Sequence, residues 1–138
     1  MNFNCVGRDS KGQMTMKFHK PFTTVEKIQL LQRSILVNSF AYYELNENIL
    51  SDFQYDTNAM QLVDLMKNHP DEADRTRYSE YFYDYCPTEE DVHYTSGFDL
   101  LERVKKADND LFRHIWIDAA MALDMKRRKK EETDNEIR

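Results

Sequence analysis

The chain has 138 residues, which is the size of one domain with a single hydrophobic core. Only three Gly and three Pro are present, too few for the many tight turns of a sandwich or barrel, so helices are favoured. A formal net charge of -6 argues against a polyanion-binding surface across the whole domain. Cys5 and Cys86 have no metal-type or redox spacing, and no apolar run approaches the roughly 20 residues that cross a bilayer. We therefore expect an acidic cytoplasmic protein without membrane contact.

Residues 1–22 differ in pattern from the rest of the chain. The segment from Gly7 to Gly12 has turn composition, and Met14 to Phe18 alternates apolar and polar residues with a period of two. This pattern predicts a small β-hairpin. Two strands alone are marginal in water, so the hairpin must pack on the helices or fray.

The segment 23–69 predicts a helical hairpin, and its first helix begins at a capping box. In that motif the Thr23 hydroxyl accepts the backbone N–H of Glu26, while the Glu26 carboxylate accepts the N–H of Thr23. Apolar residues then recur at helical spacing through about Glu44, which predicts one broad buried face. These residues are Val25, Ile28, Leu31, Ile35, Leu36, Phe40, Tyr42 and Tyr43.

The second helix of the hairpin is predicted from a second capping box, Ser51 to Gln54. Asparagines at 46 and 48 favour a turn between the two helices. The sequence places the apolar face of the second helix at Phe53, Met60, Val63 and Met66. His69 and Pro70 end it, because proline disfavours helix in the residue before it.

Additional helices are predicted over 70–131, followed by a frayed polar tail at 132–138. An aromatic segment from Tyr78 to Tyr85 either packs on the hairpin as an irregular helix or offers an aromatic face to a ligand or partner. A third helix is indicated by Phe98, Leu100, Leu101 and Val104, and a fourth follows cap candidates at Asp108, Asn109 and Asp110. The predicted fold is thus one mainly α domain with a helical hairpin, two or more further helices and a small N-terminal β-hairpin.

A basic run closes the fourth helix and consists of Lys126, Arg127, Arg128, Lys129 and Lys130. Cations at a helix C-terminus are favoured by the helix macrodipole, which explains the run without any ligand. An anionic partner such as a nucleic acid is the alternative interpretation. We favour the solvated helix end and keep nucleic-acid binding as a subsidiary hypothesis.

Catalytic and metal chemistry have no visible basis in the sequence. There is no Gly-rich phosphate loop, and the four histidines are far apart, without zinc-ligand spacing. Cys86 and His93 could be imagined as a nucleophile and a base, but no third group completes the arrangement. We therefore predict neither catalytic nor metal-binding residues, and a protein that is not an enzyme.

The segment around the hairpin turn resembles the N-terminal Ia domain of NAD-dependent DNA ligases. That family has paired aromatic residues at a helix end, a short loop carrying Asp, a Tyr-Asp pair in the next helix and a closing His-Pro. This chain has the same order in Tyr42-Tyr43, Leu50-Ser51-Asp52, Tyr55-Asp56 and His69-Pro70. It also resembles the stand-alone "DNA ligase LigA-related" proteins of Gram-positive bacteria and their phages, through the Thr95–Leu100 stretch.

The resemblance implies a site for NAD or nicotinamide mononucleotide. In the ligases the tyrosines stack on nicotinamide and the aspartates bind the ribose side, which by position implies Tyr42, Tyr43, Asp52, Tyr55 and Asp56. The chain departs from the family at the adenylation motif, because Lys106-Ala107-Asp108-Asn109 lacks the required glycine. A complete ligase also cannot fit in 138 residues.

Two functions follow from these observations. The first is a non-catalytic, stand-alone Ia-like module that binds NAD or nicotinamide mononucleotide. The second is a phage-encoded inhibitor, of the anti-CRISPR type, that uses the same helical scaffold to bind a host defence protein. A protein partner in the bacterial cytoplasm is expected from the second, since an acidic surface can block a nucleic-acid channel.

Overall fold

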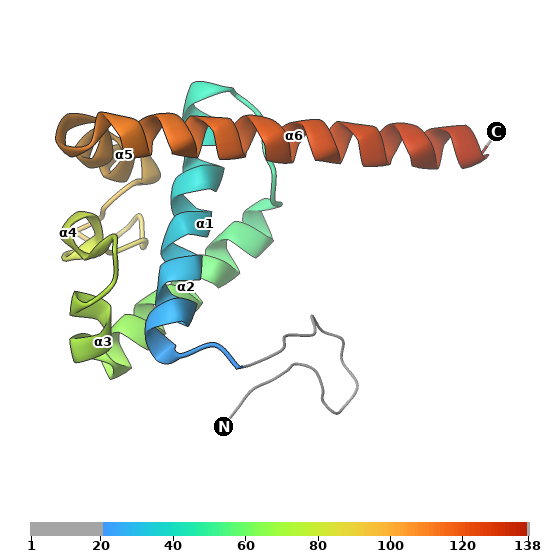
Figure 1. Cartoon of the computed structure of the whole chain (residues 1–138). Coiled ribbons are helices and arrows are strands. Elements are labelled where there is room, and N and C mark those ends of the chain that lie inside the picture. Colours follow the sequence, from blue (N-terminus) through green and yellow to red (C-terminus); the bar gives the residue numbers. More distant parts are fainter. Residues whose placement is uncertain (1–20, 138) are drawn as a thin grey trace.

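The fold is built around one central helix, α1 (Figure 1). The computed structural model describes residues 21–137. The helices within that range are α1 (Thr24–Glu44), α2 (Asp52–Asn68), α3 (Pro70–Asp74), α4 (Ser79–Phe82), α5 (Gly97–Ala107) and α6 (Asn109–Ile137). α1 contacts α2, α3, α5 and α6, and α5 in turn packs on both α4 and α6. The predicted helical hairpin is present as α1 and α2, with further helices after it.

The mainly helical class is confirmed, but the predicted fold class needs one correction. No strand occurs among residues 21–137, so a β-hairpin is not part of the described fold, and its inclusion was wrong. Residues 1–20, on which that prediction fell, lie outside the described residues, and Pro21 to Thr23 precede α1 without regular structure. Alternation of apolar and polar residues over only five positions is weak evidence for a strand, because a short strand forms only where other strands or helices pack against it.

Side-chain caps fix where the longer helices begin. The Glu26 N–H donates to Thr23 Oγ1 at 3.1 Å, and the Thr23 N–H donates to the Glu26 carboxylate at 2.8 Å, which confirms the first capping box. The second box, at Ser51, is confirmed in the same way. A third box was not predicted: Ser96 caps α5 with Asp99 in the position that Glu or Gln usually takes.

The buried face of α1 follows the predicted stripe except at its C-terminal end. Ile28, Ile35, Leu36 and Phe40 are buried as expected. Tyr42 and Tyr43 belonged to the same predicted stripe but are 54% and 42% exposed. The stripe is instead completed by Ser39 and Ala41, whose small side chains allow α2 and α5 to approach this end of α1.

The buried face of α2 differs from the predicted one. Ala59 and Leu62 are buried against α1, whereas Phe53 is 79% exposed and Met60 is 49% exposed. Tyr55 and Met66 pack partly on the core, so the contact stripe runs through Tyr55, Ala59, Leu62 and Met66. Phe53 and Met60 are spaced as neighbours on one helix face, but that face lies beside the stripe that contacts α1.

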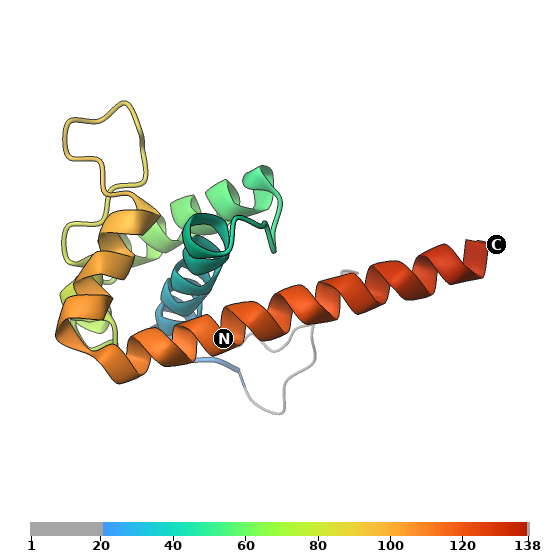
Figure 2. The same cartoon turned by 90° about the horizontal axis from the view of Figure 1, so that it is seen from above.

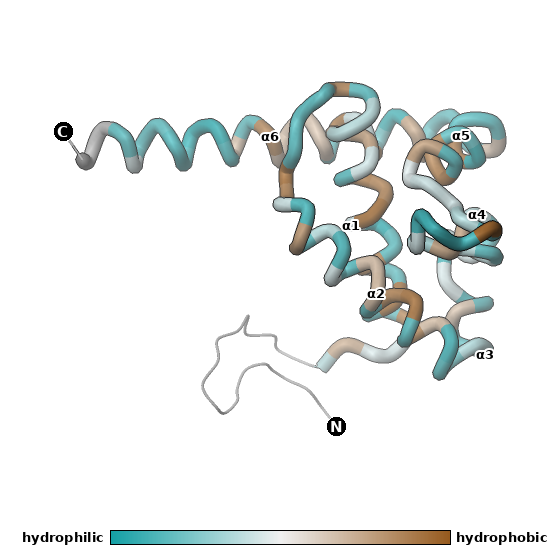
Figure 3. The backbone as a smooth tube through the Cα atoms, turned by 180° about the vertical axis from the view of Figure 1, so that it is seen from behind, coloured by the Kyte–Doolittle hydropathy of each residue, from teal (hydrophilic) through white to brown (hydrophobic). Residues whose placement is uncertain are grey.

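α6 crosses the body and then projects beyond it (Figures 1 and 2). Its first half buries Leu111, Ile115, Ala119 and Leu123 against the other helices. Arg33 of α1 reaches across to it, donating from Nε to the Asp118 carboxylate at 3.2 Å. The projecting half is hydrophilic (Figure 3) and stays helical through Ile137, across the residues for which we expected fraying. No helix within residues 21–137 combines the length and the apolar character needed to span a bilayer.

The aromatic segment that precedes α5 divides between core and surface. Tyr78, Tyr81 and Phe82 are buried, and α4 packs mainly on α5. Tyr78 also accepts a hydrogen bond from Arg33 of α1 at 3.0 Å, so the segment belongs to the core and contacts the hairpin only in part. Tyr83 is 75% exposed and lies under the Arg103 guanidinium, whose central carbon is 5.0 Å from the ring centre. Tyr85 is half-buried and contacts Phe82 edge-on.

Candidate functional site

The five residues that the sequence singled out line one pocket of about 370 Å³. The C-terminal end of α1 supplies Tyr42 and Tyr43, and the first turn and a half of α2 supplies Asp52, Tyr55 and Asp56. The remaining wall is formed by Asn38, Ser39, Asn48, Ile49, Leu50, Pro87, Glu89, Tyr94 and Gly97. The pocket therefore lies at the hairpin turn, closed on one side by the segment that leads into α5.

The Ser51 cap places the two aspartates. It starts α2 at Asp52, and because a helix turns once in 3.6 residues, Asp52 and Asp56 lie on the same face, one turn apart. Both side chains are exposed. Two exposed carboxylates at this spacing can accept hydrogen bonds from neighbouring hydroxyls, such as those of a ribose.

The two tyrosines of α1 offer ring surface at the pocket rim. The Tyr42 and Tyr43 ring centres are 4.8 Å apart and nearly perpendicular, at 86°. Tyr43 also meets the Phe98 ring of α5 edge-on, with centres 5.9 Å apart. These contacts orient the rings, while their exposure leaves surface for a flat ligand to stack on.

Tyr55 differs from the other four because its polar atom is already engaged. Its hydroxyl lies 2.9 Å from the Ser39 hydroxyl, and its side chain is only partly exposed. Burial raises the pKa of Tyr55, an effect that the hydrogen bond with Ser39 reduces without reversing. Its first role is therefore to join α2 to α1 at the floor of the pocket.

Gly97 closes the floor beneath that hydrogen bond. A Cβ atom at this position would stand 2.2 Å from Ser39 Oγ and 3.2 Å from the Tyr55 hydroxyl, closer than atoms can approach in the first case. Only glycine lets the N-terminus of α5 come this close to α1. The Ser96 cap starts α5 at this contact.

Acidic groups dominate the electrostatics of the pocket. Asp52, Asp56 and Glu89 line it, and no Lys or Arg is among the residues that form its wall in the described part of the chain. Burial raises the pKa of Tyr43, and nearby Tyr42 and Glu89 raise it further. The pKa of Tyr94 is raised in the same way by burial, then by Tyr43 and Glu89. The pocket thus favours a cationic or hydrogen-bond-donating ligand over an anion.

Nine lining residues were not predicted as site residues, and three of them bring polar side chains to the pocket in different ways. Asn38 stands four residues before Tyr42 on the same helix face, a spacing that could have indicated it. Its Nδ2 donates to the Ser34 carbonyl at 2.7 Å, but its buried Oδ1 accepts no hydrogen bond from the described residues. Glu89 and Tyr94 come from an irregular segment, where no periodic signal marks them.

Three residues of the basic run of α6 make contacts with other groups of the same chain. Lys126 Nζ donates to the Asn48 carbonyl at 2.6 Å, which connects α6 to the loop between α1 and α2. Arg128 pairs with Asp124 at 3.0 Å, and Arg127 approaches the same carboxylate at 3.9 Å. These contacts explain part of the run without an anionic partner, and one of them fixes a residue of the pocket wall.

Comparison with known proteins gives no relative: no protein-family model, curated protein or solved structure matches the chain. The resemblance to the ligase Ia domain therefore rests on the sequence motif. In residues 21–137, no three His, Cys, Asp or Glu side chains are grouped so that they could hold a metal ion. The exposed tyrosine rings and carboxylates of the pocket offer stacking surface and hydrogen-bond acceptors to a ligand.

Proposed function

We propose that the chain is a non-catalytic binding module whose pocket takes the nicotinamide nucleoside part of NAD or nicotinamide mononucleotide. The observation that carries the proposal is the convergence of Tyr42, Tyr43, Asp52, Tyr55 and Asp56 on one pocket. Its volume of about 370 Å³ also lies within the ordinary range for small-molecule sites.

Each part of the ligand meets a matching group in this proposal. The cationic pyridinium ring stacks on Tyr42 or Tyr43, a cation–π contact worth about 0.5 to 2 kcal/mol. The ribose hydroxyls donate to Asp52 and Asp56, and hydrogen bonds to charged groups contribute roughly 1.5 to 3 kcal/mol each. The carboxamide N–H donates to Asn38 Oδ1, the buried acceptor that the described residues leave unpaired.

Calorimetric titration with nicotinamide mononucleotide and with NAD tests the proposal. We expect measurable binding to the wild-type chain and a loss of about tenfold or more for Asp56→Asn, which removes a charged acceptor. Asp64→Asn is the matched control, since Asp64 is exposed on the same helix but does not line the pocket. Absence of heat at millimolar ligand, or equal losses in both variants, would count against a nicotinamide site.

A second candidate function is supported by a different surface. Ile117, Met121 and Met125 recur every four residues on α6 and are 51%, 59% and 67% exposed, so they form an outward apolar stripe. Met-rich helix faces are common in protein recognition because the side chain adapts to its partner. This stripe would serve the alternative function, in which the chain binds and inhibits a host defence protein.

Capture from lysate of a bacterial host tests the second candidate. We expect a stoichiometric partner that is retained by the wild-type chain and lost with Met121→Glu, which places a charge in the middle of the stripe. Gln61→Glu is the control, because it adds the same charge at an exposed position of α2 outside the stripe, and this variant should retain the partner. If no stoichiometric protein is recovered, the inhibitor interpretation fails and the stripe is an ordinary exposed helix face.

A further inference from the structure

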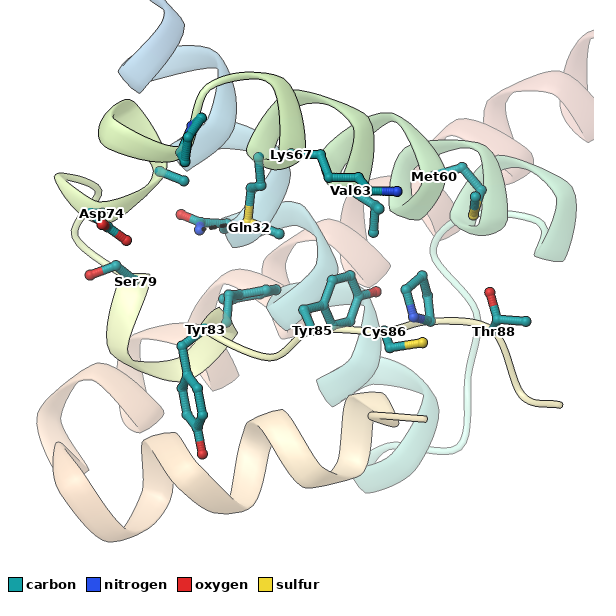
Figure 4. Close-up of a pocket in the computed structure, with 15 residues that line it drawn as sticks. Gln32, Met60, Val63, Lys67, Asp74, Ser79, Tyr83, Tyr85, Cys86 and Thr88 are labelled. Carbon is teal, nitrogen blue, oxygen red and sulfur yellow. Dashed lines mark hydrogen bonds between the residues drawn. The ribbon is translucent and has the colours of Figure 1, made fainter. Parts of the chain in front are cut away.

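A second and larger cavity lies on the other side of the segment that bounds the nicotinamide pocket. Its volume is about 560 Å³, and it lies between α2 on one side and α4 with residues 85–88 on the other (Figure 4). The two cavities share only Pro87 among their lining residues. Nothing in the nicotinamide proposal accounts for this second cavity.

The walls of the cavity are mainly apolar and adaptable. α2 contributes Met60, Val63 and Met66, and the opposite wall contains Phe82 and Tyr85. Unbranched methionine side chains can shift to fit an entering molecule more readily than branched ones. Lys67 and Asp74 bring one charge of each sign to the edge, so the cavity does not favour an ion of either sign.

A buried amide oxygen at the floor has no hydrogen-bond donor among the described residues. The Gln32 side chain enters from α1 between the two walls, and its residue is 0% exposed (Figure 4). Its Nε2 makes a weak contact with Met66 Sδ at 3.7 Å. Its Oε1 accepts no hydrogen bond from any described residue. Buried side-chain carbonyls are normally paired, so an unpaired one beside a cavity indicates a missing donor.

We propose that this cavity binds an uncharged, largely apolar ligand that donates an N–H hydrogen bond to Gln32 Oε1. The apolar walls supply most of the contact area, and the single buried acceptor sets orientation, which is the usual division in small-molecule sites. Met66 also lines the cavity, and its polar contact with Gln32 Nε2 is long, so its flexible side chain can shift to admit a ligand. The proposal is independent of the nicotinamide site.

Matched pairs of small aromatic probes test the proposal on the full wild-type chain. Indole and benzamide each carry an N–H donor, whereas 1-methylindole and N,N-dimethylbenzamide have similar shapes without it. The readout is the NMR signal of the methionine ε-methyl groups. Met60 and Met66 report on the cavity, and Met121 and Met125, which do not line it, serve as internal references.

We expect at least one donor probe to shift the Met60 and Met66 signals saturably and to bind about tenfold more tightly than its methylated partner. In Gln32→Met the preference for the donor probe should disappear while binding of the methylated probe is retained. Gln61→Met, an exposed change on α2, should leave the preference intact.

Two results would overturn the proposal. If neither donor probe moves the Met60 and Met66 signals, the cavity is not a ligand site. If donor and methylated probes bind equally, the cavity is an unspecific apolar hollow and Gln32 Oε1 takes no ligand donor. Both comparisons use the wild-type chain, so neither result depends on whether Gln32→Met folds.

Discussion

The Ser39 and Tyr55 hydroxyls lie 2.9 Å apart and join the end of α1 to the start of α2. Gly97, the first residue of α5, packs on both side chains, so three helices meet at this one polar contact. The contact holds Tyr55 partly buried against α1, whereas Tyr42 and Tyr43 are exposed at the rim. In the proposed site, Tyr55 therefore shapes the floor, and the other two tyrosines supply the stacking surface.

Replacing Gly97 should destabilise the fold through this contact. A Cβ in Gly97→Ala would meet Ser39 Oγ at 2.2 Å and Ser39 Cβ at 2.8 Å, so α5 must shift. We expect the free energy of unfolding to fall by about 1 to 3 kcal/mol, as measured by urea denaturation. In a Ser39→Ala background the nearest atom is absent, and the loss should be smaller. Equal losses in the two backgrounds would show that Ser39 is not the obstacle.

Buried tyrosines should make the protein unstable in alkali. Burial, followed by the neighbouring Glu80, raises the pKa of Tyr81 from 10.0 to about 12, and burial also raises the pKa of Tyr85. Between pH 10 and about pH 12 the Tyr81 phenol stays protonated in the folded chain but is ionised in the unfolded chain, so the free energy of unfolding falls as pH rises. The stabilising effect is complete below pH 10 and decreases through about pH 12.

Urea denaturation between neutral pH and alkali checks this dependence. We expect Tyr81→Phe to flatten the alkaline decrease in the free energy of unfolding, because it removes one of the titrating phenols. Tyr83→Phe is the matched control, since that ring is 75% exposed on the same segment. A decrease that is unchanged in Tyr81→Phe would mean that other groups cause the alkaline loss.

Features encoded by neighbours in sequence could be predicted, and those set by packing could not. The boxes at Thr23 and Ser51 depend on residues three apart, so the starts of α1 and α2 were correct. On α2 the placement of Met66 on the buried side was right, but that of Phe53 and Met60 was wrong, because helical spacing alone does not select between neighbouring stripes and only the position of α1 does. The third box was missed because Asp, rather than Glu or Gln, completes it at Ser96.

The candidate site shows the same division. Tyr42, Asp52 and Asp56 were singled out by the resemblance to the ligase Ia domain, and the turn between α1 and α2 brings the helix ends that carry them to one pocket. Glu89 and Tyr94 reach the same pocket from a segment more than thirty residues away. Their placement depends on how that segment crosses α1 and α2, which no local pattern expresses.

The link from Lys126 to the loop between α1 and α2 should control the mobility of the pocket wall. Its ammonium donates to the Asn48 carbonyl at 2.6 Å, and the same loop contains Asn46 in a left-handed conformation at φ 57°. In Lys126→Met we expect the amides of residues 45–50 to exchange hydrogen about two- to tenfold faster, the equivalent of losing roughly one hydrogen bond. Lys129→Met is the control, and equal exchange in both variants would show that the contact does not hold the loop.

From the acidic lining of the pocket we predict that it recognises the pyridinium ring of the ligand rather than its phosphate. Asp52, Asp56 and Glu89 line the wall, and no cationic side chain of the described residues joins them. A phosphate would be repelled, while the pyridinium ring would be attracted. We therefore expect nicotinamide riboside, which lacks the phosphate, to bind at least as tightly as nicotinamide mononucleotide at low ionic strength.

Salt provides the decisive comparison for this last prediction. Raising NaCl from about 0.02 M to about 0.3 M shortens the screening length several-fold, so repulsion of the phosphate should weaken and the two affinities should converge. Reduced nicotinamide riboside has an uncharged ring and should lose about 0.5 to 2 kcal/mol of cation–π attraction. Calorimetry with the three ligands measures these differences. Tighter binding of the mononucleotide at low salt would instead indicate a cation at the phosphate, and Lys126 beside Asn48 would be the first residue to replace.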